Sequence, residues 1–190
     1  MTTRLVILGK QGAGKGTQCG LLVENYGIPH ISTGDMLRAA VAEGTEFGMQ
    51  AKAVMDAGDL VSDKIILGIV EDRLAEPDAA AGFLLDGFPR TAAQADGLVE
   101  LLAPRSVDLA INIDVPDDVV LGRMLERGRD DDTEEAISRR LALYRSETAP
   151  LLEFFNAGGY LVTVDGLGAE EEVQERIVAA IAKEAHKRDD

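Results

Sequence analysis

The sequence predicts a single α/β domain with a five-stranded parallel sheet flanked by helices. Runs of Val, Ile and Leu recur along it without polar alternation, as in strands that are buried on both faces. Segments with helical periodicity separate these runs, which is the order found in a parallel sheet with crossover helices. The length of 190 residues suits one such domain with a small insertion.

The strands and helices follow from these patterns in chain order. The predicted strands are Leu5–Leu8, a short strand at His30–Ser32, Phe83–Leu85, Leu109–Val115 and Tyr160–Val164. The predicted helices are Lys15–Tyr26, Asp35–Glu43, Glu46–Ala57, Asp63–Ala75, Thr91–Leu102, Asp117–Glu126, Thr133–Asn156 and Glu170–Lys187. Two helices within Asp35–Ala57 have no strand between them, so they indicate a small insertion that moves as a unit. Asp35 is placed to cap the first of these two helices.

Composition and charge exclude several classes of protein. The 34 acidic and 19 basic residues leave a net charge of −15, which disfavours nucleic acid or an anionic membrane surface as partner. No apolar run approaches the ~20 residues of a membrane span, and no signal-type segment precedes the first strand, so we expect a cytoplasmic protein. Cys19 is the only cysteine, which argues against an intramolecular disulfide or a cysteine-based zinc site and favours a small buried residue.

The stretch "GKQGAGKGTQ", residues 9–18, follows the first strand and opens the first helix. In this context the spacing Gly9-x-x-x-x-Gly14-Lys15 predicts a phosphate-binding loop. Its glycines let successive backbone N–H groups point into one concavity, while the helix N-terminus and Lys15 add positive charge. The hydroxyl group comes one place later than in the general pattern, at Thr17, because Gly16 follows the lysine. The loop alone indicates a nucleotide and leaves hydrolases, switches and kinases open.

Two further motifs follow predicted strands. In "STGDMLR", residues 32–38, hydroxyl groups and a glycine precede a helix that carries Arg38. In "FLLDGFPRTAAQ", residues 83–94, a buried strand ends in Asp86, and a turn with Arg90 leads to a helix that carries Gln94. A carboxylate at the carboxyl end of a strand beside the phosphate loop is suited to hold the water shell of Mg²⁺. Arg90 is expected at the same sheet edge, where open α/β folds bind ligands.

Five motifs, "GAGKGTQ", "STGDMLR", "MDAGDLV", "DGFPRTAAQA" and "RRLALYRSETAPLLEFF", occur in order along the chain. Together they resemble the adenylate kinases of the nucleoside monophosphate kinase family. The resemblance implies a P-loop NTPase fold and reversible transfer of the γ-phosphoryl group of ATP to AMP, giving two ADP, with Mg²⁺ as cofactor. It also implies a monomer whose single domain, residues 1–190, contains an AMP-binding insertion at about residues 32–61 and a short lid at about residues 128–138.

The resemblance also implies which residues bind each nucleotide. For ATP they are Gly12, Ala13, Gly14, Lys15, Gly16, Thr17, Arg123, Arg127 and Gly168. For AMP they are Thr33, Arg38, Asp59, Leu60, Val61, Gly87, Phe88, Pro89, Arg90, Gln94, Arg129 and Arg140. The implied catalytic residues are Lys15, Arg90, Arg127, Arg129 and Arg140, and Asp131 and Asp132 resemble the acidic pair of the lid. Physically, these cations supply the local positive cluster that phosphoryl transfer needs and that the acidic chain otherwise lacks.

The chain departs from some family members in its lid and leaves alternatives open. Only "GRDDD" separates Arg127 from Thr133, so the lid is short and has no cysteine zinc site. A UMP/CMP kinase would share the fold and the mechanism, but Thr33 and Gln94 favour AMP over the pyrimidine nucleotides. A P-loop switch or regulatory module without transfer activity would not explain a second nucleotide pocket.

Overall fold

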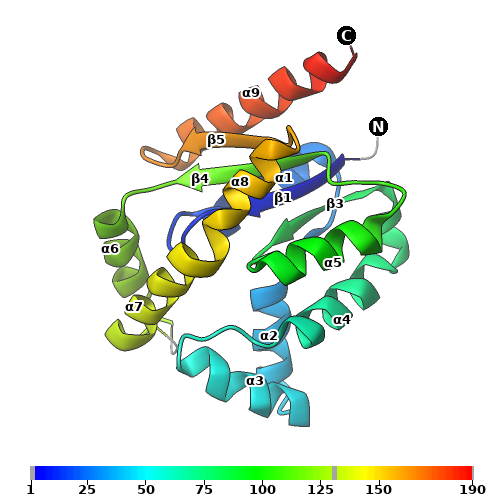
Figure 1. The fold of residues 1–190 in the computed structure, drawn as a ribbon. Coiled ribbons are helices and arrows are strands. Elements are labelled where there is room, and N and C mark those ends of the chain that lie inside the picture. Colours follow the sequence, from blue (N-terminus) through cyan, green and yellow to red (C-terminus); the bar gives the residue numbers. More distant parts are fainter. Residues whose placement is uncertain (1–2, 130–131, 190) are drawn as a thin grey trace.

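The computed structural model describes residues 3–129 and 132–189. Its strands are β1 (Thr3–Leu8), β2 (His30–Ser32), β3 (Gly82–Asp86), β4 (Leu109–Asp114) and β5 (Leu161–Asp165). All four pairings between neighbouring strands are parallel, in the order β2-β3-β1-β4-β5, so the predicted α/β fold is confirmed (Figure 1). The register places Ile7 of β1 opposite Asp86 of β3. The phosphate loop and the Asp86 turn therefore leave the sheet side by side.

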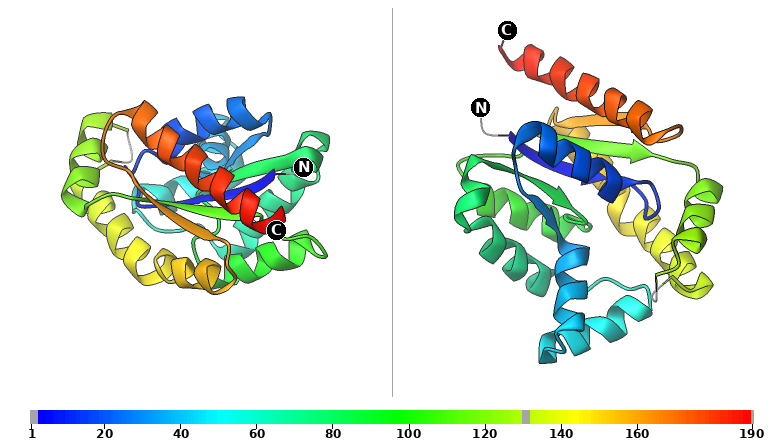
Figure 2. Two further views of the ribbon diagram at one scale, coloured as in Figure 1. Left: turned by 90° about the horizontal axis from the view of Figure 1, so that it is seen from above. Right: turned by 180° about the vertical axis from the view of Figure 1, so that it is seen from behind.

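The helices cover both faces of this sheet (Figure 2). They are α1 (Lys15–Tyr26), α2 (Thr33–Ala42), α3 (Glu46–Asp56), α4 (Asp63–Leu74), α5 (Ala92–Leu102), α6 (Asp117–Arg127), α7 (Glu134–Leu143), α8 (Pro150–Ala157) and α9 (Glu170–Asp189), with a short 3₁₀ helix at Pro77–Ala81. Helices α1 and α9 lie on one face, and α5 and α8 lie on the other. Within the described residues, no helix is both long enough and apolar enough to cross a bilayer.

Each face of the sheet has its own hydrophobic core. Alternate residues of β1 point to opposite faces, so Leu5 and Ile7 pack with α1 and α9, whereas Val6 and Leu8 pack with α4, α5 and α8. Because both faces are buried, the strand sequences are unbroken runs of apolar residues. Cys19 is completely buried in the first core, as the sequence predicts.

The helix predicted at Thr133–Asn156 is interrupted in the structure. Helix α7 ends at Leu143, a π-helical turn spans Tyr144–Thr148, and α8 begins at Pro150. Proline has no backbone N–H for a helical hydrogen bond and its ring clashes with the preceding turn. The helix therefore widens into a π-helical turn before Pro150, in which the N–H of Ala149 donates to the carbonyl of Tyr144 at 2.7 Å.

The two-helix insertion is present, but its first helix begins earlier than predicted. Helix α2 starts at Thr33, and its N-cap is Ser32, whose hydroxyl accepts a hydrogen bond from the N–H of Asp35 at 3.2 Å. The prediction that Asp35 caps this helix is therefore wrong. Asp35 lies in the first turn, where its carboxylate accepts a 2.5 Å hydrogen bond from Arg38. Helices α2 and α3 project from the body of the fold below the sheet in Figure 1.

Candidate functional site

A cleft of about 500 Å³ opens at the carboxyl ends of the strands. The phosphate loop, the insertion, the turn after β3 and the α6–α7 region all contribute to its walls. Among the described residues, seven cationic side chains line it: Lys15, Arg38, Arg90, Arg123, Arg127, Arg129 and Arg140. In a chain of net charge −15, this gathering of positive charge marks the cleft as a site for a strongly anionic ligand.

The phosphate loop packs so closely that two of its glycines leave no room for a side chain. A Cβ on Gly9 would lie 2.7 Å from the carbonyl oxygen of Ile113, and a Cβ on Gly12 would lie 2.7 Å from that of Val120. Both glycines also adopt positive φ, at 142° and 85°. The loop is consequently held against the end of β4 and against α6 while its other side faces the cleft.

The side chain of Lys15 bonds to the backbone of this loop. Its Nζ donates hydrogen bonds of 2.9 Å to the carbonyl oxygens of Gly9 and Lys10. Burial lowers the pKa of the Lys15 ammonium group, the charge of Asp86 opposes this, and the charge of Arg90 adds to it. The ammonium group is therefore poised where an anionic ligand would stabilise its charge.

The turn after β3 holds Arg90 and Thr33 against one carbonyl group. The oxygen of Gly87 accepts a hydrogen bond from Arg90 Nε at 2.8 Å and one from Thr33 Oγ1 at 2.9 Å. Thr148 anchors the same turn, since its hydroxyl donates to the carbonyl oxygen of Arg90 at 2.9 Å. The carbonyl bond occupies Nε, so the two terminal nitrogens of the guanidinium group are left to reach the cleft.

Gln94 is fixed in one amide orientation by its neighbours. Its Oε1 accepts from the N–H of Arg90 at 2.8 Å, and its Nε2 donates to Asp63 Oδ1 at 2.8 Å. Thr91, the N-cap of α5, donates to the same Asp63 oxygen at 3.0 Å and accepts from the N–H of Gln94 at 3.2 Å. Asp63 thus connects α4 to α5 and determines which hydrogen-bonding groups Gln94 presents.

The AMP-binding role that the family resemblance implies for Gln94 predicts that Thr91→Ala weakens AMP binding selectively. It removes the cap of α5 and one bond to Asp63, which should cost about 1 kcal/mol of unfolding free energy and raise KM for AMP roughly two- to tenfold. KM for ATP should stay unchanged. Denaturant unfolding and steady-state kinetics measure these effects. Thr45→Ala is the matched control, because Thr45 caps α3 in the same way but its hydroxyl bonds to Ala40 and Gly48, which do not line the cleft; equal KM changes in both variants would contradict the assignment.

Arg127 and Arg140 share one buried carboxylate. Asp132 accepts two hydrogen bonds of 2.9 Å from Arg127 and one of 3.0 Å from Arg140, and its side chain is only 1% exposed. Asp132 therefore orients two cations toward the cleft. Asp131, the other member of the predicted acidic pair, lies outside the described residues.

The cations of the cleft destabilise one another. Burial lowers the pKa of Arg90, and Arg140 and Arg38 lower it further, while Asp86 opposes them. Burial likewise lowers the pKa of Arg129, together with the charges of Arg127 and Arg38. A bound polyphosphate would relieve this repulsion, so the electrostatic energy stored in the free protein favours an anionic ligand.

Most of the predicted site residues lie around this single cleft. The lining contains, besides the seven cations, Gly12, Gly14, Gly16, Thr17, Thr33, Asp59, Leu60, Val61, Asp86, Gly87, Phe88, Pro89 and Gln94. Of the described residues predicted to bind nucleotides, Ala13 and Gly168 are not part of it. Ala13 is turned inward, with its N–H bonded to the carbonyl of Lys10 at 3.1 Å. Gly168 lies in the loop before α9, although Arg123 reaches that loop at the carbonyl of Gly166.

Other lining residues were missed by the sequence reasoning. Met55 and Tyr144 line the cleft, and the carbonyl oxygen of Met55 accepts a hydrogen bond from Arg140 at 3.1 Å. Tyr144 opens the π-helical turn, which was predicted as ordinary helix. Pro150, six residues further along, was the signal that this helix is irregular.

Comparison with known proteins gives a consistent result. Residues 7–160 match the family model described as "Adenylate kinase". The chain is 50% identical over 184 residues to the adenylate kinase of Leptospira biflexa serovar Patoc, an alignment that covers 94% of this chain and 99% of the relative. It is 52% identical over 184 residues to the adenylate kinase of Stenotrophomonas maltophilia, covering 94% and 98%. The corresponding values for the adenylate kinase of Corynebacterium glutamicum are 52% over 182 residues, covering 95% and 99%.

Proposed function

This chain belongs to the adenylate kinase family and catalyses reversible phosphoryl transfer from ATP to AMP, and we propose that it does so with Mg²⁺, through the residues that line the cleft. The observation that carries the residue assignment is the gathering of seven cations around one cleft. Phosphoryl transfer spreads negative charge over the moving group, so the protein has to supply positioning and positive charge. A nucleophilic side chain and a covalent intermediate are not needed.

In this proposal the two ends of the cleft bind different nucleotides. At the phosphate loop, the backbone N–H groups and Lys15 hold the phosphates of ATP, and Arg123 approaches them from α6. At the turn after β3, Thr33, Arg38 and Arg90 hold AMP, with Arg90 on its phosphate and Gln94 at its adenine edge. Arg127, Arg129 and Arg140 line the same cleft and bind the phosphoryl group in transit.

The donor atoms of the cleft fit Mg²⁺. Asp86 supplies carboxylate oxygens and Thr17 a hydroxyl group, and both residues line the cleft. Hard oxygen donors of this kind are what Mg²⁺ prefers, and it usually keeps several waters. We assign Asp86 to hold that water shell, and the bound cation would supply positive charge beside the phosphates of ATP.

The insertion at about residues 32–61 and the lid at about residues 128–138 are proposed to close over the nucleotides and to exclude water, which would otherwise accept the phosphoryl group. Contacts between α7 and the end of the insertion support this. Arg139 Nε donates to Asp59 Oδ1 at 2.6 Å, and Arg140 donates to the carbonyl oxygen of Met55 at 3.1 Å.

We also propose that the protein is a monomer in the cytoplasm. One chain supplies every wall of the cleft described above, so catalysis does not require a second copy. The net charge of −15 supports a protein that avoids nucleic acid and anionic membrane surfaces.

The proposal predicts that AMP is the preferred phosphoryl acceptor. A coupled assay with ATP and Mg²⁺ should show ADP formation with AMP at a kcat/KM at least tenfold above that with CMP, UMP or GMP. The physical reason is the fixed amide of Gln94, whose donor and acceptor suit the adenine edge. Preference for CMP or UMP would indicate a pyrimidine nucleotide kinase, and nucleotide binding without transfer would indicate a regulatory module.

A further inference from the structure

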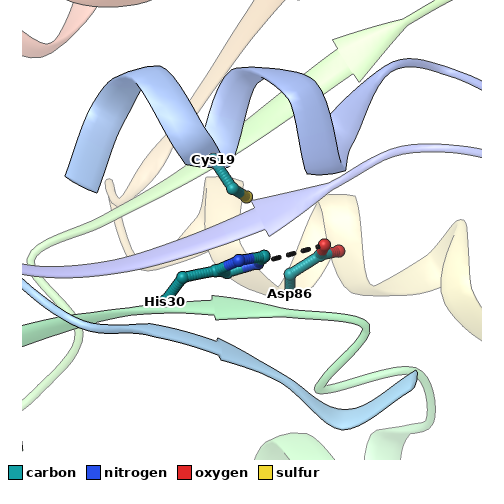
Figure 3. Close-up of side chains that lie close together, drawn as sticks. All are labelled: Cys19, His30 and Asp86. Atoms are coloured by element: carbon teal, nitrogen blue, oxygen red, sulfur yellow. Dashed lines mark hydrogen bonds and ion pairs between the residues drawn. The ribbon is translucent and has the colours of Figure 1, made fainter. Parts of the chain in front are cut away.

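Three metal-type donors meet beneath the phosphate loop, outside the cleft lining except for Asp86. Cys19 comes from α1, His30 from β2 and Asp86 from the end of β3, and their Sγ, ring nitrogen and carboxylate oxygen all lie within 4.8 Å of one another. Figure 3 shows the Cys19 side chain directed from α1 toward the imidazole ring and the carboxylate. His30 Nε2 and Asp86 Oδ2 are 3.3 Å apart. In the described part of the chain, this is the one cluster of three such donors.

We propose that Cys19, His30 and Asp86 form a binding site for a thiophilic divalent cation of the Zn²⁺ class. Sulfur, imidazole nitrogen and carboxylate oxygen are the three donor types that Zn²⁺ takes in proteins. With Zn²⁺–ligand bonds of about 2.0–2.3 Å, tetrahedral geometry requires ligand atoms about 3.3–3.7 Å apart. The His30–Asp86 distance of 3.3 Å already meets this requirement. The other separations are within 4.8 Å, so Cys19 Sγ needs a movement of at most about 1.5 Å.

The charges of the site are compatible with a dication. On binding, the metal replaces the thiol proton of Cys19, which passes to solvent, and the neutral imidazole of His30 keeps one nitrogen free to coordinate. The thiolate and the Asp86 carboxylate then balance the two positive charges. The Lys15 ammonium group, which interacts electrostatically with both Asp86 and Cys19, opposes the metal and lowers its affinity.

This site differs from the one assigned to Mg²⁺, although the two share Asp86. Mg²⁺ prefers oxygen donors, whereas the sulfur and the imidazole select softer metals. The low cysteine count argues against a site built from several thiolates, but not against one with mixed donors. The site is not sealed from solvent, since the side chains of His30 and Asp86 are 24% and 13% exposed.

Occupation of the site inhibits the kinase, and this step rests on the proposed function. A metal bound to Asp86 withdraws that carboxylate from Lys15 and from the water shell of Mg²⁺. No structural change elsewhere in the protein is required, because both sites use Asp86. Binding and inhibition can therefore be tested separately.

Cobalt is the probe for binding, because a thiolate ligand produces a sulfur-to-metal charge-transfer band that needs no activity. Titration of the full chain with Co²⁺, without nucleotide or Mg²⁺, should produce this band, and Zn²⁺ should abolish it. Cys19 is the only cysteine, so Cys19→Ser should eliminate the band. His30→Asn should weaken Co²⁺ binding at least tenfold. The other histidine supplies the matched control, His186→Asn, which should bind like the wild type; absence of the band in the wild type overturns the site.

Inhibition is tested with the same variants under turnover. Zn²⁺ should inhibit ADP formation from ATP and AMP at saturating Mg²⁺, and a chelator should restore the rate. Cys19→Ser and His30→Asn should keep the basal rate and require at least tenfold more Zn²⁺ for half-inhibition. Equal inhibition of wild type and Cys19→Ser overturns the regulatory step. A chain that shows the cobalt band but no transfer to AMP would instead contradict the proposed function and leave the metal site standing.

Discussion

Replacement of Arg90 by alanine should lower kcat/KM for AMP by about 10³-fold or more, which corresponds to about 4 kcal/mol of transition-state stabilisation. Arg90 is held by the bond from its Nε to the carbonyl oxygen of Gly87, so its terminal nitrogens have a fixed direction. A guanidinium group in this position forms charge-assisted hydrogen bonds to a phosphate. Arg90→Lys should recover only part of the loss, because lysine lacks the planar fork.

The same substitution should have little effect on stability. Burial and the neighbouring cations Arg140 and Arg38 lower the pKa of Arg90, so folding disfavours its charged form and its removal costs little. We expect an unfolding free energy within about 1 kcal/mol of the wild type. Steady-state kinetics with varied AMP and denaturant unfolding make the two measurements. Arg105→Ala, at an exposed arginine outside the cleft lining, is the control; a near wild-type kcat/KM in Arg90→Ala would remove Arg90 from the site.

Much of the fold was predictable because burial on both faces of the sheet leaves a local signal. Unbroken apolar runs predict the strands, and the glycine-rich loop predicts the start of α1. The end of α7 was harder to predict, because helical periodicity continues through Tyr144–Thr148 and only Pro150 indicates the irregular turn. The start of α2 was predicted two residues late because Asp35 is itself a good capping residue, and Ser32 occupies that role instead.

The cations of the site were predictable from motifs, but their supporting contacts were not. Gln94 and Asp63 are 31 residues apart, and His30 and Asp86 are 56 apart, so no local pattern connects either pair. Asp132 could be predicted as a lid residue through the family resemblance. Its burial between Arg127 and Arg140 depends on how α6 and α7 pack, which a single sequence does not reveal.

Lys15→Met should reduce kcat at least 10³-fold, about 4 kcal/mol, while the fold persists. Methionine preserves the approximate length of the side chain but removes the charge that stabilises the phosphoryl group in the transition state. It also leaves the carbonyl oxygens of Gly9 and Lys10 without the ammonium donor. Lys10→Met is the matched control, because Lys10 belongs to the same loop but pairs with Asp117 at 2.7 Å outside the cleft lining. Its kcat should stay within a few-fold of the wild-type value.

The pH dependence of the wild type provides a second, independent readout of Lys15. Burial lowers the pKa of its ammonium group, so the active protonated form is lost at a lower pH than an ordinary lysine would be. Burial raises the pKa of Cys19 and of Tyr144, so neither of these groups competes for that titration. The alkaline fall of kcat/KM should therefore begin below the usual lysine range. Lys15→Arg should move this fall to higher pH, because a guanidinium group stays charged throughout; an unchanged alkaline limb in Lys15→Arg would show that another group controls it.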